Sequence, residues 1–211
     1  MPPQIIDVDL ENFHRIPREC RATLFWEMDH DDRAVTARFQ KEEWFSSTLL
    51  EWGLCGKLLV GDGLDPGAMS AQPESRQEGH GFAEFAPATL FPRLQRFPAG
   101  EAASPAGTVY LAYCYVTAAR RGHGLGTALV REVARSAVDR GYRAVEALGD
   151  RAWDGGWVIP VTFLAANGFH VVRDDDRFPL LRLDLRGERE PLRRREESAL
   201  PAFEIPTTGS P

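Results

Sequence analysis

One glycine-rich segment, Arg120-Arg-Gly-His-Gly-Leu-Gly-Thr127, constrains the fold more than any other part of the chain. The residues before it, 109–116, are a β-branched and aromatic run of strand length. After it, apolar residues recur at helical spacing up to Gly141, which is typical of a helix C-terminus. A strand, a glycine turn and a helix N-terminus in this order form an anion site, because free N–H groups and the positive end of the helix dipole meet there. The segment therefore predicts a phosphate site.

Two common phosphate-binding patterns do not fit this segment. The pattern G-x-G-x-x-G requires a third glycine where this chain has Thr127 or Leu129, and no Gly-Lys-Ser/Thr follows the turn as in a P-loop. The spacing that fits is Arg-x-x-Gly-x-Gly, at Arg121, Gly124 and Gly126. The alternative is a purely structural turn that only reverses the chain.

The predicted strand, the loop and the amphipathic helix together resemble motif A of the GNAT superfamily of acyl-CoA-dependent N-acetyltransferases. In that family the loop binds the pyrophosphate of CoA. A second segment, Phe163-Leu-Ala-Ala-Asn-Gly-Phe169, is similar to motif B, a short helix that ends in Gly-Phe before the next strand. The resemblance implies an α/β (α+β) fold with a mixed, mostly antiparallel sheet of six to seven strands, flanked by helices and splayed between its fourth and fifth strands.

The order of the predicted elements agrees with this resemblance. We expect strands at 5–8, 54–61, 81–87, 109–116, 144–148, 170–173 and 180–185. We expect helices at 10–28 (interrupted near Pro17), 35–52, 125–140 and 160–166, and irregular inserts at 62–79 and 88–107. Residues 1–186 are predicted to be one GNAT-like domain, and 187–211 a flexible charged tail that contains Pro, Ser and Thr.

Composition limits the classes of partner. The net charge of −6 argues against nucleic-acid binding, because a polyanion needs a basic face. No apolar run reaches the roughly 18 residues of a membrane span, and the N-terminus lacks the pattern of a secretory signal. The three cysteines, Cys20, Cys55 and Cys114, have no metal-ligand spacing. We expect a cytoplasmic monomer or homodimer with no metal and no membrane contact.

The resemblance also implies a cosubstrate, acetyl-CoA, and the residues that bind it. Pantetheine would pair with the backbone of residues 114–117, namely Cys114, Tyr115, Val116 and Thr117. The amide of Cys114 would polarise the thioester carbonyl. The remaining cofactor-binding residues would be Arg121, Gly122, His123, Gly124, Leu125, Gly126, Thr127 and Asn167. Cys114 is also conceivable as a nucleophile, but no histidine is spaced to activate it.

The resemblance leaves the general base and the general acid open. Where some family members carry glutamate, four residues before Cys114, this chain has Tyr110. Glu84 and, less favoured, Glu146 are then the carboxylates expected to face the cleft. At the motif B position where many members carry tyrosine this chain has Leu164, so Tyr110, Tyr113, another group or water would protonate the leaving thiolate.

The resemblance implies that the acceptor site is formed by the first helices and by the loop after the fifth strand. Two groups there, Phe25-Trp26-Glu27 and Trp153, Asp154 and Trp157, each combine an aromatic wall with a negative charge, although aromatic residues also often fill a core. The expected activity is direct transfer of an acetyl group to a primary amine of a small molecule or a protein. The alternative is a non-catalytic acyl-CoA-binding or regulatory module on the same fold.

Overall fold

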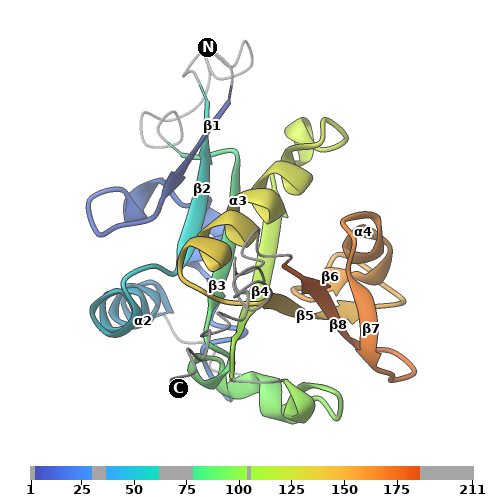
Figure 1. Ribbon diagram of the computed structural model, residues 1–211. Coiled ribbons are helices and arrows are strands. Elements are labelled where there is room, and N and C mark those ends of the chain that lie inside the picture. Colours follow the sequence, from blue (N-terminus) through green and yellow to red (C-terminus); the bar gives the residue numbers. More distant parts are fainter. Residues whose placement is uncertain (1–2, 30–36, 62–77, 104–105, 186–211) are drawn as a thin grey trace, which may run out of the picture.

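The computed structural model describes residues 3–29, 37–61, 78–103 and 106–185. Within these ranges one mixed sheet has the strand order β1-β2-β3-β4-β5-β8-β7, with β6 beside β5 (Figure 1). The strands are β1 (Gln4–Asp7), β2 (Gly56–Val60), β3 (Gly81–Ala86), β4 (Thr108–Val116), β5 (Ala144–Asp150), β6 (Ile159–Pro160), β7 (His170–Arg173) and β8 (Leu180–Asp184). Only the pairs β4–β5 and β5–β6 are parallel. The predicted mixed, mostly antiparallel sheet is confirmed, and β6 is a strand that we did not predict.

Helices cover both faces of the sheet. The helix α3 (Leu125–Asp139) lies across one face, over β2 to β5 (Figure 1). Its buried residues Leu129, Val133 and Ala137 recur every four positions, so they form one apolar stripe against the sheet. On the other face, Phe45 of α2 (Ala37–Trp52) packs in the core cluster that contains Phe82. The short helix α4 (Val161–Ala166) follows β6.

The predicted helix over 10–28 is wrong. The chain forms only the 3₁₀ turn η1 (Phe13–Arg15) and the short helix α1 (Arg18–Arg21) in this region. Pro17 explains the break, because its ring excludes the helical conformation at the preceding residue, and Ile16 is extended with ψ of 134°. Phe13, Ile16, Cys20, Leu24 and Trp26 of the segment are buried all the same, which is why their spacing resembled that of a helix, whereas Leu10 is exposed.

The two predicted inserts have different outcomes. The insert at 88–107 contains three 3₁₀ turns, η4 (Ala88–Leu90), η5 (Pro92–Arg96) and η6 (Gly100–Ala102), and it buries Phe91 and Leu94 in the core. Most of the other insert, residues 62–77, lies outside the described residues, as does the predicted tail at 187–211.

The feature of the sheet that matters most for function is the divergence of β4 from β5. The two strands pair only from Thr108 to Tyr110 on β4, and the described part of β5 does not pair with the six β4 residues that follow. A β-bulge in the pairing of β3 with β4 lies at the same place, because Phe85 pairs with Leu111 but Glu84 pairs with Tyr113. The predicted splay between the fourth and fifth strands is confirmed.

Candidate functional site

A cavity of about 550 Å³ lies beside the unpaired half of β4. The end of β4, the glycine turn with the first residues of α3, and the loop after β5 form most of its wall. The lining residues are Glu19, Tyr113–Val116, Arg120–Gly122, Gly124–Thr127, Trp153, Gly155–Pro160 and Phe163. The predicted cofactor loop and the splayed strand therefore share one cavity.

The backbone of β4 presents amide groups to this cavity. Thr117 N–H donates to the carbonyl of His80 at 2.9 Å, so the amide of Thr117 faces the β3 side. Because successive residues of a strand direct their polar groups to opposite sides, the amides of Cys114 and Val116 face the side from which β5 has diverged. The carbonyl of Val116 on this side accepts Nε–H of Arg121 at 2.9 Å. The amide of Cys114 is placed to donate to a ligand in the gap.

The N-terminus of α3 forms a second donor group. Gly122 and Gly124 have φ of 80° and 75°, the left-handed conformation that favours glycine. A Cβ at either position would meet no atom within 4 Å, so the backbone is open to an approaching ligand. The first helical bond runs from Ala128 N–H to Gly124, and no acidic side chain lies in the first turn. The amides of residues 125–127 and the helix dipole are thus available to an anion.

The Cys114 side chain does not have the properties of an activated nucleophile. Its Sγ lies 3.9 Å from the carbonyl oxygen of Gly126, on the α3 side of the sheet. Burial raises the pKa of the Cys114 thiol to about 12. The thiol is therefore protonated at neutral pH, and only a thiolate would be an effective nucleophile.

Three of the predicted cofactor residues do not line this cavity. Thr117 bonds His80 through its amide, and the Nδ1 atom of the His123 ring lies 2.9 Å from the carbonyl of Arg121. Asn167 lines a separate cavity of about 190 Å³ beside α3, and its side-chain amide donates to Phe163 at 2.8 Å. The other predicted cofactor residues do line the main cavity.

Glu84 does not lie at the cleft where we expected it. Its side chain is buried inside the sheet, where Nζ of Lys41 donates to its Oε2 at 2.6 Å. Lys41 also bonds Glu27. Burial and the neighbouring Glu27 raise the pKa of Glu84 well above its ordinary value. Trp26 and Glu27, predicted to bind the acceptor, are likewise buried in the interior and do not line the cavity.

The other residues predicted as acid or base candidates do not line the cavity. The Tyr110 hydroxyl is buried and accepts the amide of Leu148 at 3.3 Å, so this side chain does not reach the cavity. Arg182 on β8 donates to the buried carboxylate of Glu146 at 3.0 Å. Leu164, at the position of the family's tyrosine, is fully buried in the core. The tyrosines that do line the cavity are Tyr113 and Tyr115.

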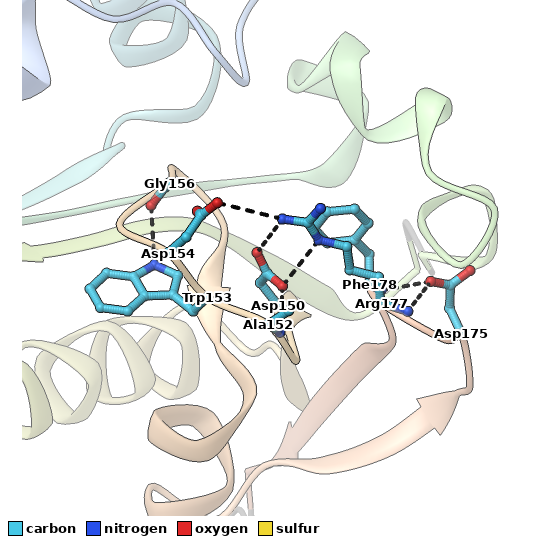
Figure 2. A network of polar contacts seen from close by, with 8 residues as sticks. All are labelled: Asp150, Ala152, Trp153, Asp154, Gly156, Asp175, Arg177 and Phe178. Carbon is cyan, nitrogen blue, oxygen red and sulfur yellow. Dashed lines mark hydrogen bonds and ion pairs between the residues drawn. The ribbon is translucent and has the colours of Figure 1, made fainter.

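Polar contacts hold the loop after β5 in place (Figure 2). Asp150, at the end of β5, accepts the amide of Ala152 at 2.8 Å and pairs with Arg177 at 3.4 Å. Arg177 also lies 4.0 Å from Asp154, and Trp153 Nε1–H donates to Gly156 at 3.2 Å. The loop is therefore tied to the turn between β7 and β8. Trp153 lines the cavity as predicted, whereas Asp154 pairs with Arg177 and does not line it.

Glu19 and Phe163 are among the lining residues that sequence reasoning did not predict as site residues. Phe163 packs against the start of α3, where a Cβ on Gly126 would come within 3.0 Å of its ring. Glu19 is exposed on α1 and is the one carboxylate among the described lining residues. No spacing in the sequence indicated Glu19, because the turn at Pro17 and the packing of α1 bring it to the end of β4.

Comparison with known proteins identifies the family resemblance. Residues 78–154 match the model of the acetyltransferase (GNAT) family. No curated protein sequence matches this chain. The resemblance to the GNAT superfamily inferred from motifs A and B is confirmed by this match together with the fold.

Solved structures with the same fold cover nearly all of this chain. An N-acetyltransferase from Staphylococcus aureus has a TM-score of 0.54 at 16% identity, over 88% of this chain and 99% of its own. A putative acetyltransferase from Salmonella typhimurium, solved with its cofactor acetyl-CoA, has a TM-score of 0.55 at 15% identity, over 90% and 98%. A GNAT superfamily phosphinothricin acetyltransferase from Sinorhizobium meliloti, in complex with acetyl-CoA, has a TM-score of 0.52 at 16% identity, over 88% and 89%.

Two further findings concern other classes of ligand. In the described part of the chain no helix is long and apolar enough to cross a membrane. The same residues contain no group of three or more His, Cys, Asp or Glu side chains that would hold a metal ion.

Proposed function

Because this chain has the GNAT fold, we propose that it transfers an acetyl group from acetyl-CoA to a primary amine by direct attack of the amine on the thioester. The observation that carries this proposal is that the free amide of Cys114 and the open N-terminus of α3 lie in one cavity. The first group suits a carbonyl oxygen and the second suits a phosphate. Acetyl-CoA carries both.

Different parts of the cavity would bind different parts of acetyl-CoA. The amides of residues 125–127 and the side chain of Arg121 would bind the pyrophosphate, and the open positions at Gly122 and Gly124 let it approach the backbone. The free edge of β4 would pair with the pantetheine arm as an added strand does. The solved relatives from Salmonella typhimurium and Sinorhizobium meliloti, which hold acetyl-CoA, support this assignment.

The chemical step would depend mainly on a backbone amide. The amide of Cys114 would donate to the thioester oxygen as negative charge develops there, a stabilisation of about 3 kcal/mol in other enzymes. The amine nitrogen forms its bond to the carbonyl carbon, and the C–S bond then breaks. A protonated Cys114 thiol favours this direct route over an acetyl-cysteine intermediate.

Two substitutions at one position test the anion site. Gly124→Asp and Gly124→Asn have nearly the same shape, and both residues tolerate a positive φ better than most, so they differ mainly in charge. By calorimetry we expect Gly124→Asp to weaken acetyl-CoA binding about thirtyfold more than Gly124→Asn does. This ratio corresponds to roughly 2 kcal/mol of repulsion between the new carboxylate and the pyrophosphate of acetyl-CoA. Equal affinities of the two folded variants would contradict the anion site.

Turnover decides between the enzyme and a binding module. Release of free CoA, measured with acetyl-CoA and a panel of primary amines, should exceed the rate without amine. One structural observation favours the non-catalytic acyl-CoA-binding module. Leu164 is a buried core residue at the position where many family members have the tyrosine that protonates the leaving thiolate. Tight acetyl-CoA binding without transfer to any amine of the panel would establish the module.

A further inference from the structure

We infer that the acceptor is a monoamine with an aromatic or other flat apolar group, and that Glu19 binds its ammonium. This inference rests on the proposed function and specifies the acceptor part of the same cavity. It depends on four residues that share one side of the cavity, Glu19, Tyr113, Tyr115 and Trp157.

The cavity has two chemically different walls. Cys114 and Val116 point to the face of the sheet that α3 covers, where both pack against the core cluster that contains Leu129. Tyr113 and Tyr115 point to the opposite face, as the alternation of side chains along a strand requires. The phosphate-binding turn lies at the start of α3. The guanidinium of Arg121 lies 5.8 Å from the centroid of the Tyr115 ring, so the turn borders this wall. The rest of the wall of Tyr113 and Tyr115 is left for the acceptor.

The acceptor wall is aromatic. The rings of Tyr113 and Tyr115 are stacked, with an interplanar angle of 11° and centroids 6.2 Å apart. The ring of Trp157, from the loop after β5, lies 5.2 Å from that of Tyr113. Side chains of this kind bind flat apolar groups well, because they supply a large surface and lose little conformational freedom. Trp157 also packs against the core cluster that contains Phe82, which holds its ring in place.

Glu19 supplies the negative charge of this wall. Its carboxylate is one cause of the raised pKa of Tyr115, after burial, so the two groups are neighbours. The nearby cation Arg21 is already paired with Glu78 at 2.9 Å. Within the described part of the chain Glu19 forms no ion pair, and it is exposed. A carboxylate in this condition is available to an ammonium group that comes from solvent.

A single carboxylate also limits the charge of the acceptor. The other charged residues of the described lining are Arg120 and Arg121, which are positive. A polyamine would place its second and third ammonium groups near these arginines or on apolar rings without a counter-ion. A monoamine has one charge for Glu19 and an uncharged body for the rings. The cavity therefore favours monoamines over polyamines.

Glu19 acts in binding, and the reaction balances without its titration. The bound ammonium loses one proton to solvent and becomes the neutral nucleophile. Its nitrogen bonds to the thioester carbon, the C–S bond breaks, and a second proton passes from nitrogen to the sulfur. The products are the N-acetyl amine, CoA thiol and one proton in solution. Removal of the Glu19 charge should therefore change KM for the amine and leave kcat nearly unchanged.

The experiment compares acceptors and variants at saturating acetyl-CoA. We expect kcat/KM for 2-phenylethylamine to exceed that for ethylamine by about a hundredfold, since a buried phenyl group contributes roughly as much as a buried phenylalanine side chain. Spermidine should be at least about tenfold poorer than 2-phenylethylamine, because two of its charges lack partners. A preference for spermidine or ethylamine would overturn the inference.

Variants test the two parts of the wall separately. Glu19→Gln should raise KM for 2-phenylethylamine about tenfold, as expected for loss of one charged hydrogen bond, and leave acetyl-CoA affinity unchanged. The matched control is Glu11→Gln, at an exposed position away from the cavity. Trp157→Ala should raise KM more than Trp157→Phe, which keeps a ring. An unchanged KM in Glu19→Gln, or a loss of kcat at constant KM, would contradict the binding role.

One measurement does not depend on turnover and separates the two proposals. Calorimetry with 2-phenylethylamine in the presence of CoA should detect binding by the native protein and about tenfold weaker binding by Glu19→Gln. Binding without acetyl transfer would refute the proposed function but support the acceptor assignment. Acetyl transfer to other amines, with no binding of 2-phenylethylamine, would refute the acceptor assignment alone.

Discussion

Two regions of this molecule carry glutamates in opposite situations. Glu27 and Glu84 are buried with Lys41 in the interior, whereas Glu19 stands exposed at the edge of the cavity. The interior pair is bonded to an ammonium of the protein itself, and Glu19 has no such partner among the described residues. The comparison shows that burial and pairing, more than residue type, decide whether a carboxylate is available to a ligand.

The two carboxyl groups of the interior cluster have pKa shifts of opposite direction. Burial is the largest single influence on the pKa of Glu27 and raises it, but the charge of Lys41 and the hydrogen bonds to the carboxylate together outweigh it, so the net shift is downward. The pKa of Glu84 is raised by burial and by the charge of the neighbouring Glu27. Glu84 therefore binds a proton more readily than Glu27, which has the lowered pKa beside Lys41. Protonation of one carboxyl group lowers the cost of burying the cluster.

The largest expected effect breaks this cluster. Lys41→Met keeps the length of the side chain and removes its charge, which leaves Glu27 buried without its counter-ion. We expect the free energy of unfolding in urea, followed by circular dichroism, to fall by about 3–5 kcal/mol. The double variant Lys41→Met/Glu27→Gln removes both charges and should recover part of the loss. A loss below about 1 kcal/mol in the single variant would show that the cluster is not a buried ion pair.

A smaller effect concerns the proton on Glu84. Its pKa is raised in the folded protein above the ordinary 4.5, so its contribution to stability is complete below about pH 4.5 and is lost as the pH rises through the folded value. Glu84→Gln cannot ionise and avoids this loss. We expect the stability of the native protein relative to Glu84→Gln to fall as the pH rises above about 4.5, by at most about 1.4 kcal/mol per pH unit. Parallel pH profiles of the two proteins would contradict a protonated Glu84.

The smallest expected effect concerns the cavity rather than the interior cluster. Cys114→Ala keeps the backbone amide and removes the thiol. Turnover with acetyl-CoA and an accepted amine should stay within about threefold of the native value, because the donor to the oxyanion is unchanged. A loss of a thousandfold or more, with an acetyl-enzyme seen by mass spectrometry of the native protein, would instead assign covalent catalysis to this residue.

The strand and the glycine turn that form part of the cavity wall could be recognised from local patterns in the sequence. The glycines at 122, 124 and 126 have a local spacing that indicates a turn before a helix, and the strand before them is a local pattern too. The placement of Glu84, Glu27 and Trp26 failed, since each depends on what packs against it. Their neighbours, such as Lys41 on α2, are distant in the sequence and carry no signal for the contact.

The sequence by itself determined the order of most elements and the glycine turn at the start of α3, because these follow from interactions between residues close in the chain. The helix expected at 10–28 and the unpredicted strand β6 are exceptions. The sequence also determined the resemblance to the GNAT superfamily, which the splay of β4 from β5 and the match over residues 78–154 confirm. Only the tertiary structure decided which side chains reach the cavity. In the folded protein Tyr110, Glu84 and Glu146 are buried, and Glu19 lies at the end of β4. The sequence does not indicate these positions, because burial and long-range pairing depend on segments that meet only in the folded chain.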